Sequence, residues 1–139
     1  MRKNKYLLYA IFFALQFPIG IASAQIAESL KSKNWVEAGG NRLLEVFYIP
    51  ELIQIDQFGI ATILIKQILT QTIDNANSQI SIIQMNCGTN QYALEYVEQY
   101  KGSNLDGQFL AGGRMPPPLM WNSINEGNAY FKLKSIVCR

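Results

Sequence analysis

The sequence contains no histidine, so it lacks the side chain that most often acts as a general base and as a metal ligand. Its acidic residues are few and scattered, and we cannot place two of them in one cleft, as glycoside hydrolysis requires. Glu95 and Glu98 come closest, but residues three apart in a strand point to opposite faces, so we interpret both as surface charges. We therefore predict a protein that is not an enzyme, and we assign it no catalytic, cofactor-binding or metal-binding residue.

Charge of either sign is sparse, at 16% of the residues, and the 12 basic and 10 acidic side chains give a net charge of +2. Three of the basic residues, Arg2, Lys3 and Lys5, lie in the N-terminal segment that we expect to be removed, and no acidic residue does. Removal therefore leaves 9 basic residues (12 less these 3) against 10 acidic ones, a net charge of −1. A balance this close to zero gives no indication of a nucleic-acid partner.

The first 24 residues have the pattern of a signal peptide. A basic start is followed by an apolar run from Tyr6 to Phe17, and the small residues Ala22-Ser23-Ala24 then predict cleavage before Gln25. The alternative is a membrane anchor, which needs a run of about 20 apolar residues. Because this run is shorter, we expect a mature chain without a membrane span, exported to the periplasm or the outer surface of a Gram-negative bacterium. Residues 25–139 are then one domain in length.

Cysteine is nearly absent as well, with only Cys87 and Cys138 in the chain. Two distant cysteines in a small exported domain predict a disulfide, which here would tie the C-terminus to the end of an apolar run. The bond would close a loop of about 50 residues, worth about 4 kcal/mol in the chain-entropy model. The alternative is a pair of free, buried thiols.

Runs of β-branched and aromatic residues between turn signals predict an antiparallel sheet. We expect strands at residues 35–38, 44–49, 60–69, 80–87 and 91–100. A helix over residues 60–69 remains open on periodicity alone, and residues 74–78 are expected to form a loop. In the last of these strands, alternation places Tyr92, Tyr96 and Tyr100 on one face. We interpret that face as covered by a helix, with a binding face as the alternative.

The C-terminal third begins with a segment rich in glycine and proline, residues 102–119, which we expect to be an extended loop. Gly112-Gly113-Arg114 is too short a match to indicate a phosphate-binding loop. Pro116-Pro117-Pro118 either stiffens this loop or docks in an aromatic groove of a partner. We take Arg114 and these three prolines as candidate partner-binding residues.

A C-terminal helix is predicted after this loop, with Asn128 as its N-cap and apolar residues at helical spacing behind it. Trp121 is expected to be mostly buried where the chain enters the helix. We assign Trp35, Trp121 and Asn128 as structural anchors, and we expect Cys138 to pin the helix against the strand that ends at Cys87.

The order of these landmarks resembles that of the surface-adhesin protein E family of small exported bacterial proteins. The resemblance covers the mature chain and rests mainly on its C-terminal end. It follows, in order, Trp35, Phe47-Tyr48, Cys87, Tyr92, Tyr100, Gly102, Trp121-x-x-Ile124, Gly127-Asn128, Leu133 and Val137-Cys138. The chain departs from the family pattern at two places. Pro50 stands where an acidic residue often follows the aromatic strand in the family, and residues 60–69 lack the tryptophan that the family often has in its next long strand.

The resemblance implies an α+β fold, with about six antiparallel strands and a C-terminal helix held to the sheet by the disulfide. It also implies adhesion to host extracellular-matrix and serum proteins, and dimers. We therefore predict a non-enzymatic exported binding protein with a protein partner, without cofactors, that also forms homodimers. A structural or inhibitory module of the periplasm is the alternative. Because residues 60–69 and 80–85 are apolar on both sides, the dimer is expected to use the sheet face or edge away from the helix.

Overall fold

The structure is a computed structural model that describes residues 29–139, so the predicted signal peptide, residues 1–24, lies outside the described residues. The chain divides into a short N-terminal unit, Met1–Lys33, and a larger unit, Asn34–Arg139. In the first unit, residues 29–31 form one helical turn, and the Lys33 N–H donates to the Leu30 carbonyl at 3.1 Å.

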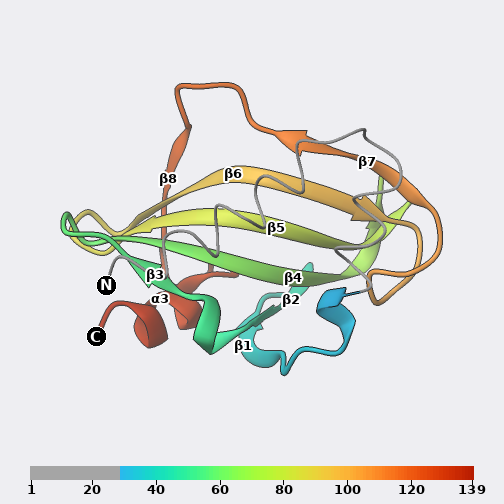
Figure 1. Ribbon diagram of the computed structural model, residues 1–139, viewed down its shortest axis with the longest axis horizontal. Coiled ribbons are helices and arrows are strands. Elements are labelled where there is room, and N and C mark those ends of the chain that lie inside the picture. The colour runs from blue at the N-terminus through green and yellow to red at the C-terminus, as the bar shows by residue number, and fades with distance from the viewer. Residues whose placement is uncertain (1–28) are drawn as a thin grey trace. The chain divides into compact units, whose positions relative to one another are not determined.

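The second unit is an antiparallel sheet with a C-terminal helix (Figure 1), which confirms the predicted fold class. The strands are β1 (Val36–Gly40), β2 (Leu44–Tyr48), β3 (Gln54–Ile55), β4 (Ile60–Ile73), β5 (Ala76–Asn86), β6 (Gln91–Tyr100), β7 (Phe109–Arg114) and β8 (Trp121–Ser123). A 3-10 turn, η1 (Pro50–Leu52), precedes β3, and the helix is α3 (Phe131–Val137). The described part of the chain thus has eight strands rather than about six, since β3 and β8 are short additions.

The long hairpin of β4 and β5 forms the middle of the sheet. The strand predicted over residues 60–69 is confirmed over its helical alternative, and it continues to Ile73. The turn to β5 needs only Asp74 and Asn75, both at positive φ (50° and 66°), which these two residue types tolerate better than most. The predicted loop over residues 74–78 is therefore wrong beyond these two positions, because Ala76 already pairs with Ile73.

The sheet order is β1-β2-β4-β5-β6-β7, with every pair antiparallel. Two strands share the outer side of β6. β7 pairs with its C-terminal half (Tyr96↔Arg114 to Tyr100↔Phe109), and β8 pairs with its N-terminal end (Gln91↔Ser123 to Ala93↔Trp121). The chain between β7 and β8, residues 115–120, therefore crosses the junction between two partners of one strand (Figure 1).

The helix α3 covers one face of the sheet. Leu133 and Val137 are buried in a cluster with Val46, Ile63 and Ile83 from the strands. Directly after the helix, Cys138 is bonded to Cys87, the residue after β5, at a Cα–Cα distance of 5.4 Å. The predicted disulfide and the predicted attachment of the helix to the strand ending at Cys87 are both confirmed. We call this side of the sheet the helix face.

The predicted loop over residues 102–119 is wrong in its middle, because residues 109–114 form β7. Gly112 pairs with Glu98, and a Cβ atom at this position would lie 2.6 Å from the Val97 carbonyl oxygen. The glycine therefore allows β7 to approach β6 closely rather than making the segment flexible. Two loops remain, residues 101–108 before β7 and residues 115–120 after it, and we call the second the junction loop.

A β-bulge in β6 overturns the predicted tyrosine face. Ile82 pairs with Tyr96 but Ile83 pairs with Leu94, so Glu95 is an extra residue. One extra residue reverses the alternation of the side chains that follow it. Tyr92 therefore packs on the helix face, with its ring 4.7 Å from that of Tyr130, whereas Tyr96 and Tyr100 lie on the opposite face.

The two-sided apolar pattern of β4 and β5 is confirmed by their register. Ile63, Ile65 and Ile83 belong to the core cluster under α3, while Leu64 pairs with Ile82 on the other side of the sheet. We call this second side the distal face.

Among residues 29–139 no helix is both long and apolar enough to cross a membrane.

Candidate functional site

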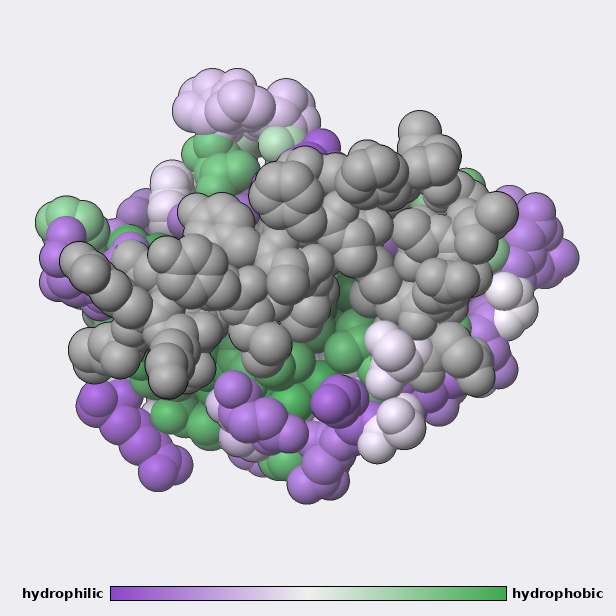
Figure 2. Space-filling view, in the orientation of Figure 1, coloured by the Kyte–Doolittle hydropathy of each residue, from purple (hydrophilic) through white to green (hydrophobic). Residues whose placement is uncertain are grey.

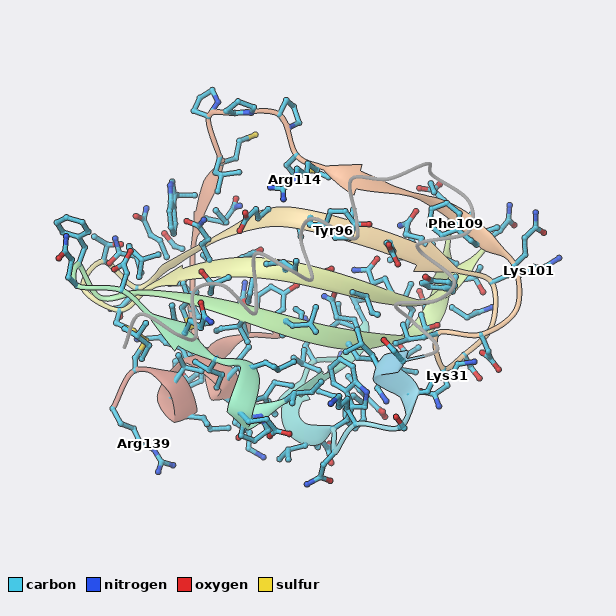
Figure 3. The ribbon with its side chains drawn as sticks, viewed as in Figure 1. Lys31, Tyr96, Lys101, Phe109, Arg114 and Arg139 are labelled. Atoms are coloured by element: carbon cyan, nitrogen blue, oxygen red, sulfur yellow. A yellow bond between two sulfur atoms is a disulfide. The ribbon has the colours of Figure 1, made fainter. Side chains whose placement is uncertain are left out.

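The junction loop carries the candidate partner-binding residues predicted from the sequence. Pro116, Pro117 and Pro118 are exposed, the Pro117–Pro118 peptide bond is cis, and Arg114 lies at the base of the loop (Figure 3). Met120, at 80% exposure, is the most exposed of the large hydrophobic residues among those described. Figure 2 shows the segment between β7 and β8 projecting at the top of the view, mostly in light purple on the hydrophilic side of the scale, with a green hydrophobic area at its base.

Trp121 is not the buried anchor that the sequence predicts. It lies in β8 opposite Ala93, ten residues before α3, and it is 37% exposed. Its position on an edge strand, where only β6 pairs with it, leaves part of the indole in solvent. Trp121 therefore joins the candidate binding residues instead of the structural anchors.

The prediction for Asn128 is wrong in its position. The N-cap of α3 is Tyr130, without a side-chain cap, and Asn128 instead accepts a hydrogen bond from the Tyr130 N–H at 2.8 Å in the turn before the helix. The described structure places Trp35 half-buried beside Lys66, whose Nζ lies 5.1 Å from the centre of the indole ring.

Glu95, the extra residue of the β6 bulge, joins side chains from three strands at the base of the junction loop. Its Oε2 accepts from Gln84 Nε2 of β5 at 3.3 Å, and its Oε1 lies 3.7 Å from Arg114 Nη1 of β7. Its backbone carbonyl accepts from the Met115 N–H at 2.9 Å. Bulges commonly redirect a side chain near a functional site. Here the bulge brings a carboxylate, an amide and a guanidinium together beside the loop.

A strip of uncharged polar side chains continues from this network along the distal face. One row across strands β4, β5, β6 and β8 consists of Thr62, Gln84, Ala93 and Trp121. The neighbouring row on the same face contains Gln91 and Ser123. Residues directly opposite one another in a sheet share a face, so these side chains all point the same way. We call Thr62, Gln84, Gln91 and Ser123 the polar strip, and Gln84, Glu95, Arg114 and Trp121 the junction site.

Sequence reasoning missed the role of the two Glu residues. The prediction that Glu95 and Glu98 point to opposite faces is wrong, because the bulge places both on the distal face. Glu98 is also not a surface charge, since it is 1% exposed and accepts hydrogen bonds from the Tyr96 and Tyr100 hydroxyls. Burial, followed by the hydrogen bond to Glu98, raises the pKa of both tyrosines, so they stay protonated and act as donors.

Lys66 lies in the same row of the distal face as Glu98, two strands away. Its Nζ donates to Asn104 Oδ1 at 3.1 Å and lies 4.9 Å from the centre of the Phe47 ring. Desolvation by burial lowers the pKa of this lysine. Because Lys66 and Glu98 have partners within the fold, we interpret them as structural.

The comparisons with known proteins give no relative from which to assign a function. No family model, no curated protein and no solved structure matches this chain. The described residues also contain no group of three or more histidine, cysteine, aspartate or glutamate side chains placed to hold a metal ion. The junction site and the exposed loop above it are therefore the features on which a function must be argued.

The exposure of Trp121 leads to a prediction about stability. Trp121→Ala is expected to lower the free energy of unfolding by about 1–2 kcal/mol, because only part of the indole is removed from water. A fully buried tryptophan would cost about 3–5 kcal/mol. Urea unfolding of the mature domain measures the difference, with Phe58→Ala, an aromatic residue at 77% exposure, as the control. A loss of the larger size would show that the indole is an anchor of the fold.

Proposed function

We propose that the mature chain is a non-enzymatic exported binding protein that takes a protein partner at its junction loop. The observation that supports this most directly is the group of exposed apolar residues Pro116, Pro117, Pro118 and Met120, with Trp121 at their base. Exposed apolar surface that gathers at one place is typical of an interaction site, and tryptophan, methionine and arginine are enriched at interfaces. The disulfide is compatible with export.

The resemblance to the surface-adhesin protein E family suggests which partner to test. On this proposal the protein is an adhesin of the outer surface, and its partners are host extracellular-matrix or serum proteins. The alternative is a periplasmic module that supports or inhibits another protein. Treatment of intact cells with a protease separates the two, because it degrades a surface protein and leaves a periplasmic one intact.

The test of binding uses the mature domain against a panel of matrix and serum proteins immobilised for surface plasmon resonance. We expect at least one to bind, and we expect Met120→Ser and Pro117→Ser each to weaken binding about tenfold, or about 1.4 kcal/mol. The matched control is Phe58→Ser, which removes an equally exposed hydrophobic residue outside the loop. Binding that survives both loop substitutions would move the interface elsewhere. A panel without any bound protein would contradict the adhesin and leave the periplasmic module to be tested.

A further inference from the structure

The junction site combines an exposed aromatic ring with polar groups that the fold holds in place. Trp121 offers a partly exposed indole opposite Ala93, and the Glu95 carboxylate, two residues further along β6, is held by Gln84 and Arg114. Arg114 and Glu95 are also accessible, with side-chain exposures of 43% and 19%. The four residues come from four different strands, so the sheet fixes their relative positions without help from a long loop.

The charges of this surface balance. Glu95 and Arg114 carry opposite charges 3.7 Å apart, and the polar strip beside them consists only of amides and hydroxyls. A charged ligand would find no net opposite charge here, so the surface suits a neutral one. The side chains of Thr62, Gln91 and Ser123 make no hydrogen bond to any other residue in the part of the chain that the structure describes. Ser123 is exposed and Thr62 and Gln91 are partly exposed, so these side chains are accessible to a ligand.

Amide and hydroxyl groups supply both hydrogen-bond donors and acceptors, and a sugar hydroxyl needs both, since it donates one hydrogen bond and accepts others. The C–H face of a sugar ring is apolar and packs on an aromatic ring such as that of Trp121. From β4 to β8 the row spans three strand spacings, about 14 Å, and the neighbouring row lies about 7 Å away. The surface is thus larger than a single sugar ring and suits a short oligosaccharide.

We propose that the junction site and the polar strip bind a neutral glycan, with the sugar ring on Trp121 and its hydroxyls on Gln84, Glu95 and Arg114. This inference rests on the proposed function, because it makes the protein partner a glycoprotein whose glycan lies on the sheet while its polypeptide contacts the junction loop.

The experiment compares each protein of the matrix and serum panel before and after enzymatic removal of its glycans, and adds the released neutral glycans as free ligands. Removal of the glycans is expected to weaken binding of the mature domain about tenfold, and Trp121→Ala and Glu95→Gln are expected to do the same. The matched controls are Phe58→Ala and Glu126→Gln, an exposed aromatic and an exposed acid outside the site, which should change nothing. Urea unfolding of each variant confirms that it is folded.

The outcomes separate the two proposals. If the panel binds equally well with and without glycans, the glycan site is wrong and the protein-binding function stands. If no panel protein binds but the released glycans change the fluorescence of Trp121, measured as the difference between the wild type and Trp121→Ala, the glycan site stands without the adhesin. If the released glycans neither change this fluorescence nor compete for binding, the glycan site is overturned. A loss of glycan binding in Phe58→Ala equal to that in Trp121→Ala would also overturn it.

Discussion

Loss of the Cys87–Cys138 disulfide is expected to lower the free energy of unfolding of the mature domain by about 4 kcal/mol, since the bond joins residues 51 positions apart. The effect is large relative to the total, because single domains are stable by only about 5–15 kcal/mol. The bond also has a local role. α3 has only seven residues, and so short a helix is not stable unless it is held against the sheet.

Urea unfolding with and without reductant measures this effect, and the double variant Cys87→Ala, Cys138→Ala serves as the control. The variant should unfold at the midpoint of the reduced wild type and should not respond to reductant. Tyr130 packs in the same core cluster as Leu133 and Val137 of α3. Undocking of the helix is therefore also expected to weaken the near-ultraviolet circular dichroism to which Tyr130 contributes. A change below about 1 kcal/mol on reduction would show that packing alone holds the helix.

Features that depend on local pattern were predictable from the sequence. The strands at β2, β4, β5 and β6 follow from runs of β-branched and aromatic residues, and α3 follows from apolar residues at helical spacing. The disulfide followed from a count of cysteines together with the expectation of export, because two cysteines allow one intramolecular pairing. Arg114 and the three prolines were chosen as candidate partner-binding residues from a local pattern of the same kind, and that choice stays a prediction.

Features that depend on long-range pairing were not predictable. β7 contains two glycines, which disfavour strands, and it forms because Gly112 lets its backbone approach β6. The exposure of Trp121 is set by the strand beside it, which the sequence does not reveal. The bulge at Glu95 has no marker in the chain, yet it reverses the direction of every later side chain in β6. By strict alternation from Tyr92, Tyr96 and its partner Arg114 would lie on the helix face. The bulge is therefore what brings Arg114 to the same face as Glu95 and Gln84, and it hid the junction site from a sequence-based prediction.

The two faces of β4 differ in what covers them, and this difference gives a test of self-association. The dimer surface predicted from the sequence includes residues 60–69, but Ile65 is fully buried in the core cluster under α3. A charge placed there therefore cannot test self-association. Ile68 lies three residues further along the same strand, pairs with Glu45 and Ser78 on the distal face, and is only half-buried. The two isoleucines therefore make a matched pair for one substitution on opposite faces.

Ile65→Lys is expected to destabilise the domain by more than about 4 kcal/mol and to prevent the accumulation of folded protein, because it buries an unpaired ammonium group among apolar side chains. Ile68→Lys should fold, because position 68 is only half-buried and the long lysine side chain can extend its ammonium group into water. Circular dichroism and urea unfolding compare the two variants, and light scattering at tens of micromolar compares Ile68→Lys with the wild type. A dimer of the wild type that Ile68→Lys turns into a monomer would support self-association through the distal face. A wild type that is a strict monomer would contradict self-association, and a folded Ile65→Lys protein would contradict the packing of α3 on that side of β4.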